Sequence, residues 1–300
     1  MTSGAARQRS GPPLRAAVWM IGAIVSFTAM AVAGRAVSAQ LDTFEIMLFR
    51  SLVGIGIVLA VGGMAGTLGQ IRTDRMRLHT LRNTAHFAGQ NLWFYALSAI
   101  PLAQVFALEF TSPVWAILLA PLVLRERLTA VGLAAAALGF VGVLVVARPD
   151  PTALDPGIVA AALAAVGFAL SALFTRKLTR DQSITCILFW LTVMQAAMGL
   201  VCAGVDGDIA LPWGPALPWL TLIAVAGLVA HFCLTTALSL APAATVMPID
   251  FIRLPLIAVV GALVYGEVLD PLVLVGGAVI VGANWLNLRW SRPAAPATEM

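Results

Sequence analysis

Four charged residues lie inside otherwise apolar stretches: Arg50, Glu109, Asp250 and Arg253. A charge at the centre of a bilayer costs about 2.5–3.5 kcal/mol on insertion scales, so each one needs a partner, a wet cavity or a role. Asp250 and Arg253 are three residues apart and share one helix face, which predicts a pair within one helix. Arg50 and Glu109 are expected at depths of about 10 and 12 Å in two spans, so they also predict a pair. These four residues are either structural ion pairs or groups that contact a solute or a proton.

A second polar series follows one span: His86, Gln90, Asn91 and Tyr95. Four polar residues in one span favour a cavity wall, although a single polar side chain often only joins two helices. His231 lies in another apolar run and offers a further hydrogen-bonding side chain. Apolar wall residues are expected from neighbouring spans: Phe106, Leu108, Phe110, Phe168, Met247 and Phe251.

Three prolines accompany the buried carboxylates: Pro113 follows Glu109 by four residues, and Pro248 and Pro255 flank Asp250. Proline frees a backbone carbonyl within a helix, and membrane proteins tolerate this where the helix lines a cavity or packs on neighbours. These prolines predict helix breaks that take part in gating. The alternative is simple enrichment, because proline is more frequent in membrane helices than in soluble ones.

The elements that position these residues must be membrane-spanning helices. The chain has 300 residues, of which 60% are hydrophobic and 11% charged, with a net charge of +4 and a mean hydropathy of +0.95. Such a balance excludes a water-soluble domain, a disordered chain and a nucleic-acid-binding domain. Apolar runs predict an all-α protein with ten spans, near residues 16–38, 43–62, 79–99, 101–124, 128–147, 156–176, 184–204, 216–239, 242–265 and 269–290.

An internal repeat appears when the chain is compared with itself at an offset of 141 residues. Glu109 then matches Asp250, and Gln90 matches His231. Further matches are Phe27 with Phe168, Arg35 with Arg176, Pro101 with Pro242, Phe110 with Phe251 and Glu126 with Glu267. Five spans per repeat predict two inverted halves, residues 15–147 and 155–289, between tails at residues 1–14 and 290–300. The distribution of Lys and Arg places both tails in the cytoplasm.

Other residue patterns are read as structural. Glycines in the fifth and tenth spans, among them Gly142, Gly276 and Gly282, predict close helix packing and are compatible with a dimer face. Three cysteines in separate apolar runs form no metal motif, and the chain carries no catalytic signature. We therefore expect no enzyme activity, no cofactor, no metal and no nucleic-acid partner.

The segments around Glu109 resemble the signature of EamA-type carriers in the drug/metabolite transporter superfamily: residues 107–109 (ALE), 112–114 (SPV) and 124–128 (LRERL). A weaker copy follows at Asp250, residues 254–255 (LP) and residues 265–269 (YGEVL), and Arg50 matches a basic position common in the family. Bacterial amino-acid exporters, including exporters of aromatic amino acids, are the nearest in resemblance.

That resemblance implies a multi-pass protein of the bacterial inner membrane with a central cavity lined by spans one, three, four, six, eight and nine. It implies export of amino acids by alternating access. A carrier of drugs or other small metabolites is the alternative, and a membrane scaffold without transport is the alternative from another class. The expected partners are a small-molecule solute and the lipid bilayer, in a monomer or a dimer.

Overall fold

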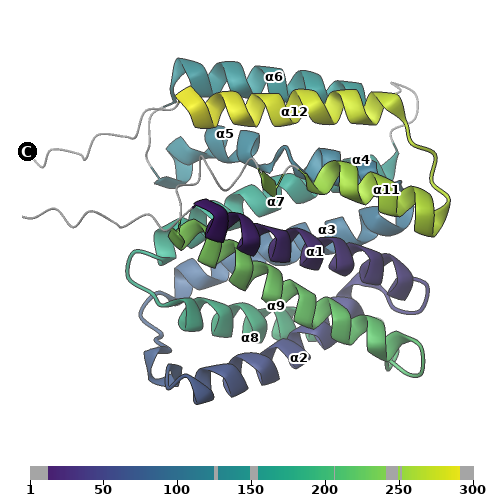
Figure 1. The fold of residues 1–300 in the computed structure, drawn as a ribbon. Coiled ribbons are helices and arrows are strands. Elements are labelled where there is room, and N and C mark those ends of the chain that lie inside the picture. Colours follow the sequence, from purple (N-terminus) through teal and green to yellow (C-terminus); the bar gives the residue numbers. More distant parts are fainter. Residues whose placement is uncertain are drawn as a thin grey trace, which may run out of the picture.

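The computed structural model is a bundle of helices, without a strand among the residues that it describes, 13–124, 128–148, 155–205, 207–240, 249–250 and 252–290. Helices are expected because lipid offers no water to the backbone, and a helix satisfies its polar groups within one segment. Figure 1 labels α1 (Pro13–Val37), α2 (Thr43–Met64), α3 (Met76–Ala99), α4 (Leu102–Glu109), α5 (Ser112–Leu124), α6 (Ala130–Ala147), α7 (Pro156–Leu178), α8 (Ile184–Ala203), α9 (Ala216–Leu240), α11 (Arg253–Tyr265) and α12 (Pro271–Trp290). A short 3-10 helix, η1 (Leu68–Gln70), follows α2.

Seven segments of the described chain are long and apolar enough to cross a membrane. They are Arg15–Val37, Thr43–Met64, Leu102–Leu124, Ala130–Ala147, Pro156–Leu178, Ile184–Ala203 and Ala216–Leu234. Helix α3 has 24 residues but carries more polar side chains, and Arg253–Tyr265 and Pro271–Asn287 are shorter apolar helices. The chain is a multi-pass helical membrane protein, and the count of ten spans stays a prediction.

The bundle has two ends that differ in charge. We call the end at which α1 leads into α2 the Leu41 end, and the opposite end, at which α2 leads into α3, the Arg72 end. Helix α1 begins and α12 ends at the Arg72 end, on the left of Figure 1. Exposed basic side chains gather there: Arg72, Arg75, Arg77, Arg176, Lys177 and Arg180. The Leu41 end carries the exposed acids Asp42, Asp155 and Asp208, together with one exposed base among the described residues, Arg148.

The main helix pairs join the two halves of the sequence. Helix α1 packs against α9, α3 against α7, α2 against α8, α6 against α12, and α4 against α11. In every pair one helix comes from the chain before residue 148 and the other from the chain after residue 155. The bundle is therefore held together largely by contacts between its halves.

The fourth expected span, residues 101–124, is two helices rather than one. Helix α4 ends at Glu109 and α5 begins at Ser112. The hydroxyls of Thr111 and Ser112 donate to the carbonyls of Leu108 and Glu109 at 2.6 and 2.7 Å, and the backbone N–H of Thr111 also donates to Leu108 at 3.0 Å. Pro113 lies in the first turn of α5, where its missing N–H leaves no helical hydrogen bond unmade. The break places Glu109 at a helix end inside the bundle.

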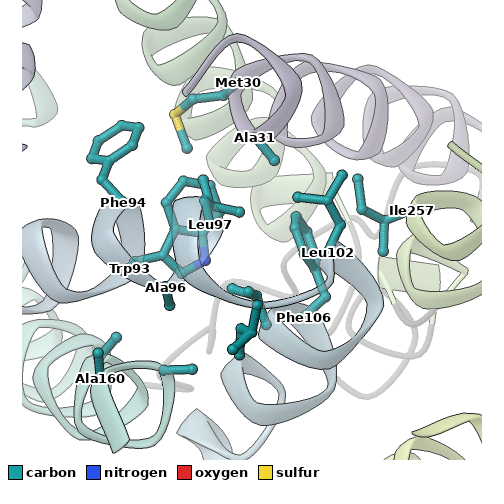
Figure 2. Packing of buried hydrophobic residues seen from close by; sticks show 14 of the residues in the cluster. Met30, Ala31, Trp93, Phe94, Ala96, Leu97, Leu102, Phe106, Ala160 and Ile257 are labelled. Atoms are coloured by element: carbon teal, nitrogen blue, oxygen red, sulfur yellow. The ribbon is translucent and has the colours of Figure 1, made fainter. Parts of the chain in front are cut away.

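The largest cluster of buried apolar side chains surrounds α4. Leu102 and Phe106 of α4 are fully buried, together with Phe94 and Leu97 of α3 and Ile257 of α11. Figure 2 shows these side chains gathered where α3, α4 and α11 meet, beside α1 and α7. Because lipid is as apolar as these side chains, their contribution to stability comes from close packing. This packing fixes the helix that carries Glu109.

Helices α6 and α12 approach each other through glycine. A Cβ atom added to Gly276 would lie 2.6 Å from a methyl carbon of Val146 and 2.8 Å from the carbonyl oxygen of Gly142. The matching Cβ on Gly142 would lie 2.8 Å from the carbonyl oxygen of Gly276. Backbone therefore faces backbone at this crossing, and a side chain on either residue would force the helices apart.

Gly276→Ala is expected to lower the unfolding midpoint in detergent, because overpacking a close contact costs about 1–3 kcal/mol. Gly282→Ala on the same helix is the control, since an added Cβ there meets nothing within 4 Å. Thermal unfolding followed by tryptophan fluorescence measures both variants. Equal midpoints for the two variants would contradict the close approach.

Candidate functional site

One face of α3 is polar along the interior of the bundle. Arg82, His86 and Gln90 follow one another at intervals of four residues, so they lie on the same helix face. Their exposed fractions are 5%, 5% and 6%. Buried polar side chains are costly unless they are hydrogen-bonded, so this face requires partners from neighbouring helices.

Helices α2 and α8 supply those partners. Arg50 of α2 donates from Nη1 to Oε1 of Gln90 at 2.7 Å and from Nη2 to Oε1 of Gln195 at 3.3 Å. The amide nitrogen of Gln195 lies 2.6 Å from Nδ1 of His86. Because the amide oxygen of Gln195 faces Arg50, its nitrogen donates to His86, which leaves the imidazole proton on Nε2. We call Arg50, His86, Gln90 and Gln195 the central network.

Aromatic rings of α7 and α9 lie against the central network, and a ring of α1 extends this aromatic side. The His86 ring centroid is 6.0 Å from that of Phe168 on α7 and 6.2 Å from that of His231 on α9. Phe27 of α1 meets the His231 ring edge-on at 5.8 Å. Helices α3 and α7 can approach closely here because Gly167 lies against Gly89, where an added Cβ would be 2.9 Å from the neighbouring Cα. The network is thus polar along α2, α3 and α8 and aromatic along α1, α7 and α9.

A second group, the Arg253 cluster, consists of Arg253, Glu109, Asp250 and Trp93. Nη2 of Arg253 lies 3.1 Å from Oε1 of Glu109 and 3.0 Å from Oδ2 of Asp250. Nε1 of Trp93 donates to the other oxygen of Glu109 at 2.8 Å. One arginine therefore holds two carboxylates, one from each half of the chain.

The guanidinium of Arg253 is enclosed by aromatic rings. It lies 4.8 Å from the ring centroid of Phe27 and 5.1 Å from those of Phe106 and Phe110. A cation over an aromatic face is stabilised by the ring quadrupole, most strongly away from water. Phe27 contacts Arg253 as well as His231, so it connects the Arg253 cluster with the aromatic side of the central network.

A third group closes the Leu41 end, and we call it the Arg35–Glu267 latch. The Arg35 guanidinium pairs with Glu267 and donates to the carbonyls of Leu97 and Ile100. Oε2 of Glu267 accepts from the backbone N–H of Leu102 at 3.0 Å. The side chains of Arg35 and Glu267 are only 15% and 13% exposed. The latch ties the end of α1 to the α3–α4 connection and to the segment between α11 and α12.

The sequence pattern of the EamA-like transporter family matches residues 14–148 and again residues 155–289. The chain belongs to the EamA-like transporter family. It is a multi-pass protein of the bacterial inner membrane.

Three relatives of this chain are named as transporters, and the named solute differs among them. An S-adenosylmethionine uptake transporter of Rickettsia felis is 25% identical over 89% of this chain and 90% of that protein. A riboflavin transporter of Brucella anthropi is 31% identical over 73% of this chain and 78% of its own length, and one of Vibrio cholerae is 28% identical over 93% and 94%. A crystal structure with 18% identity covers 90% of this chain and 95% of its own with a TM-score of 0.63, so the fold is shared. None of these three relatives is named as an amino-acid exporter.

Within this EamA-family bundle, many of the predicted site residues come together. His86, Gln90, Phe168 and His231 meet around the central network. Phe106, Phe110, Glu109, Asp250 and Arg253 meet in the Arg253 cluster. Met247, Pro248 and Phe251 lie outside the described residues.

The remaining predicted residues are placed differently. Tyr95 is 45% exposed, because it follows His86 by nine residues, or half a turn beyond two full turns, and so faces the opposite way. Asn91 donates to the carbonyl of Phe87 on its own helix at 2.8 Å, and Leu108 is fully buried in the apolar core. Pro255 is exposed on α11, and Pro113 begins α5 beside the break. The expected Arg50–Glu109 pair does not form, because Arg253 takes Glu109.

Sequence reasoning missed Gln195, Phe27, Trp93 and the latch as parts of a site. Gln195 is an amide inside an otherwise apolar run, which is the same signal that pointed to Gln90. For the latch, the signal was the 141-residue register, which matches Arg35 with Arg176 and Glu267 with Glu126. A repeated Arg and a repeated Glu at span ends indicate a repeated structural role.

Glu267→Gln is expected to lower the unfolding midpoint strongly, because it leaves the largely buried Arg35 without its anion, a loss of about 3–5 kcal/mol. Asp270→Asn is a matched control at the same end, since Asp270 pairs with Arg148 at side-chain exposures of 35% and 48%. An exposed pair contributes about 1 kcal/mol or less. Thermal unfolding in detergent compares the two, and equal losses would show that the latch is no stronger than a surface pair.

Proposed function

We propose that this chain is a secondary transporter that carries a small metabolite across the inner membrane by alternating access between two halves. The halves are residues 15–147 and 155–289, as inverted repeats of five spans each, with tails at residues 1–14 and 290–300. The family pattern matches twice, at nearly these bounds, which supports the division.

The helix pairs support an inverted repeat. If the first five spans exchange places with the second five, α1 with α9 becomes α7 with α3, which is another observed pair. The pairs α2 with α8 and α6 with α12 each become themselves. A bundle with this exchange symmetry has two equivalent ways to open, one toward each side of the membrane.

Charge supports one orientation. Lys and Arg concentrate in the cytoplasmic loops of inner-membrane proteins. Most exposed basic side chains of the described residues lie at the Arg72 end, so we place that end and both tails in the cytoplasm. The Arg35–Glu267 latch then closes the outer side.

The observation that carries the proposal is the central network with the Arg253 cluster beside it. Both groups lie in the interior of the bundle rather than at the Leu41 end or the Arg72 end, and both draw side chains from each half of the chain. Polar and ionisable residues inside a membrane bundle are expensive, and they mark substrate and ion pathways. A site shared by two halves changes its access when the halves rock against each other.

The relatives and the site together indicate the kind of solute. Riboflavin and S-adenosylmethionine each carry a flat nitrogen-containing ring with hydrogen-bonding edges. The central network offers amide and imidazole groups for such edges, and the rings of Phe27, Phe168 and His231 offer faces for stacking. We therefore propose a ring-bearing small metabolite as the solute. Export of aromatic amino acids is the second candidate, because a cation and two carboxylates near aromatic rings also suit a zwitterion.

Purified protein in liposomes is expected to exchange at least one labelled solute among riboflavin, S-adenosylmethionine and tryptophan. His86→Ala is expected to lower that exchange about tenfold, which corresponds to the loss of one good hydrogen bond. Tyr95→Phe is the control and is expected to exchange at the rate of the original protein, because Tyr95 is exposed on the far face of α3.

Two results would contradict the proposal. One is the absence of protein-dependent exchange for all three solutes. The other is equal exchange by the His86→Ala protein and the original protein, which would remove the central network from the pathway. Exchange of tryptophan, without exchange of riboflavin or S-adenosylmethionine, would favour an aromatic amino acid as the solute.

A further inference from the structure

The arginines inside the bundle fall into two kinds. Arg253 contacts two carboxylates, and Arg35 contacts Glu267. Arg50 and Arg82 contact no carboxylate among the described residues. Amide and hydroxyl oxygens satisfy the hydrogen bonds of a guanidinium but leave its positive charge uncompensated, which is costly away from water.

The partners of Arg50 and Arg82 are all neutral. Arg50 donates to the amide oxygens of Gln90 and Gln195. Arg82 donates from Nε to the hydroxyl of Thr175 at 3.1 Å and from Nη1 to the amide oxygen of Asn83 at 2.8 Å. A guanidinium has five N–H donors, so each arginine keeps donors for a further acceptor. The neutral partners hold each guanidinium in place without neutralising it.

The two arginines lie at opposite ends of one polar track. Arg82 and Gln90 are eight residues apart on the same face of α3, about 12 Å along the helix axis. Arg50 is bonded to Gln90, so it lies toward the Leu41 end, and Arg82 lies toward the Arg72 end. Between them stands His86, held by Gln195. The track thus runs from one cation to the other past a neutral hydrogen-bonding side chain.

We propose that Arg50 and Arg82 are two binding stations for an oxyanion, a carboxylate or phosphate group, of the transported solute. The group pairs with Arg50 when the site opens at the Leu41 end and with Arg82 when it opens at the Arg72 end. Guanidinium forks match carboxylate and phosphate oxygens with two parallel hydrogen bonds, which amides cannot do. This inference rests on the proposed function, because it assigns the charge of the solute at the same site.

The Arg253 cluster indicates on which side of the bundle the oxyanion binds. There, the one arginine already faces two carboxyl groups, so its charge is compensated and it attracts a further anion less than Arg50 or Arg82 does. The oxyanion is therefore directed to the α2–α3–α8 side of the bundle, and the ring of the solute to the side of Phe27 and Phe168.

Binding by matched solute pairs tests the stations independently of transport. The pairs are tryptophan with tryptophanamide, which differ in a carboxylate, and flavin mononucleotide with riboflavin, which differ in a phosphate. The readout is the rise of the unfolding midpoint with solute concentration in detergent. We expect the anionic member of at least one pair to bind ten times more tightly or better, and the responding pair distinguishes carboxylate from phosphate.

Substitutions connect that preference to the arginines. Arg50→Gln and Arg82→Gln are each expected to reduce the preference at least fivefold, and Arg50→Lys to retain part of it, because lysine keeps the charge but loses the fork. Arg289→Gln is the control for charge alone, since Arg289 is exposed at the end of α12. Neither Gln variant is expected to lower the unfolding midpoint without solute, because neither arginine loses a carboxylate partner.

The outcomes separate this inference from the proposed function. The inference is overturned if no anionic member binds more tightly than its partner, or if the preference persists in both Gln variants. Exchange of riboflavin in liposomes without any anion preference would overturn the inference and leave the transporter proposal standing. Binding of an anion without exchange of any solute would support the stations and contradict transport.

Discussion

The constraint on which the rest of this structure depends is the cost of charge inside a membrane bundle. Three arginines in the described part of the chain show three ways of reducing this cost. Arg253 is neutralised by two carboxylates and enclosed by aromatic rings. Arg35 is held by one carboxylate and two backbone carbonyls. Arg50 is held only by amides, so its charge stays available.

These solutions also connect the halves of the chain. Glu109 and Arg253, Arg50 and Gln195, and Arg35 and Glu267 each join residues far apart in sequence. Contacts between such residues give the closed bundle its specificity, since apolar side chains in lipid provide little preference for one partner. A carrier that alternates between two openings must break and remake some of them. The latch belongs to one end of the bundle, whereas the central network lies between both ends.

Much of the fold could be predicted from the sequence, because lipid imposes a simple length and composition on every span. The break near Pro113 and the pairing of Asp250 with Arg253 were also predictable, since both depend on neighbours along the chain. The pairing of Glu109 with Arg253, rather than with Arg50, could not be predicted from the sequence. Depth within the membrane can be estimated from sequence, but the direction in which a helix turns its side chains depends on tertiary packing. Tyr95 shows the same limit, because the helical angle between residues 86 and 95 points it away from His86.

Accessibility of the central network tests alternating access most directly. The protein for this measurement carries Gln195→Cys, with Cys186, Cys202 and Cys233 replaced by alanine, and is reconstituted in liposomes in a known orientation. A membrane-impermeant thiol reagent is added either outside or inside, with and without the transported solute. Reaction of residue 195 from both sides, slowed by the solute in each case, is the result that alternating access predicts. Reaction from neither side, or from one side only, would contradict a pathway through the central network.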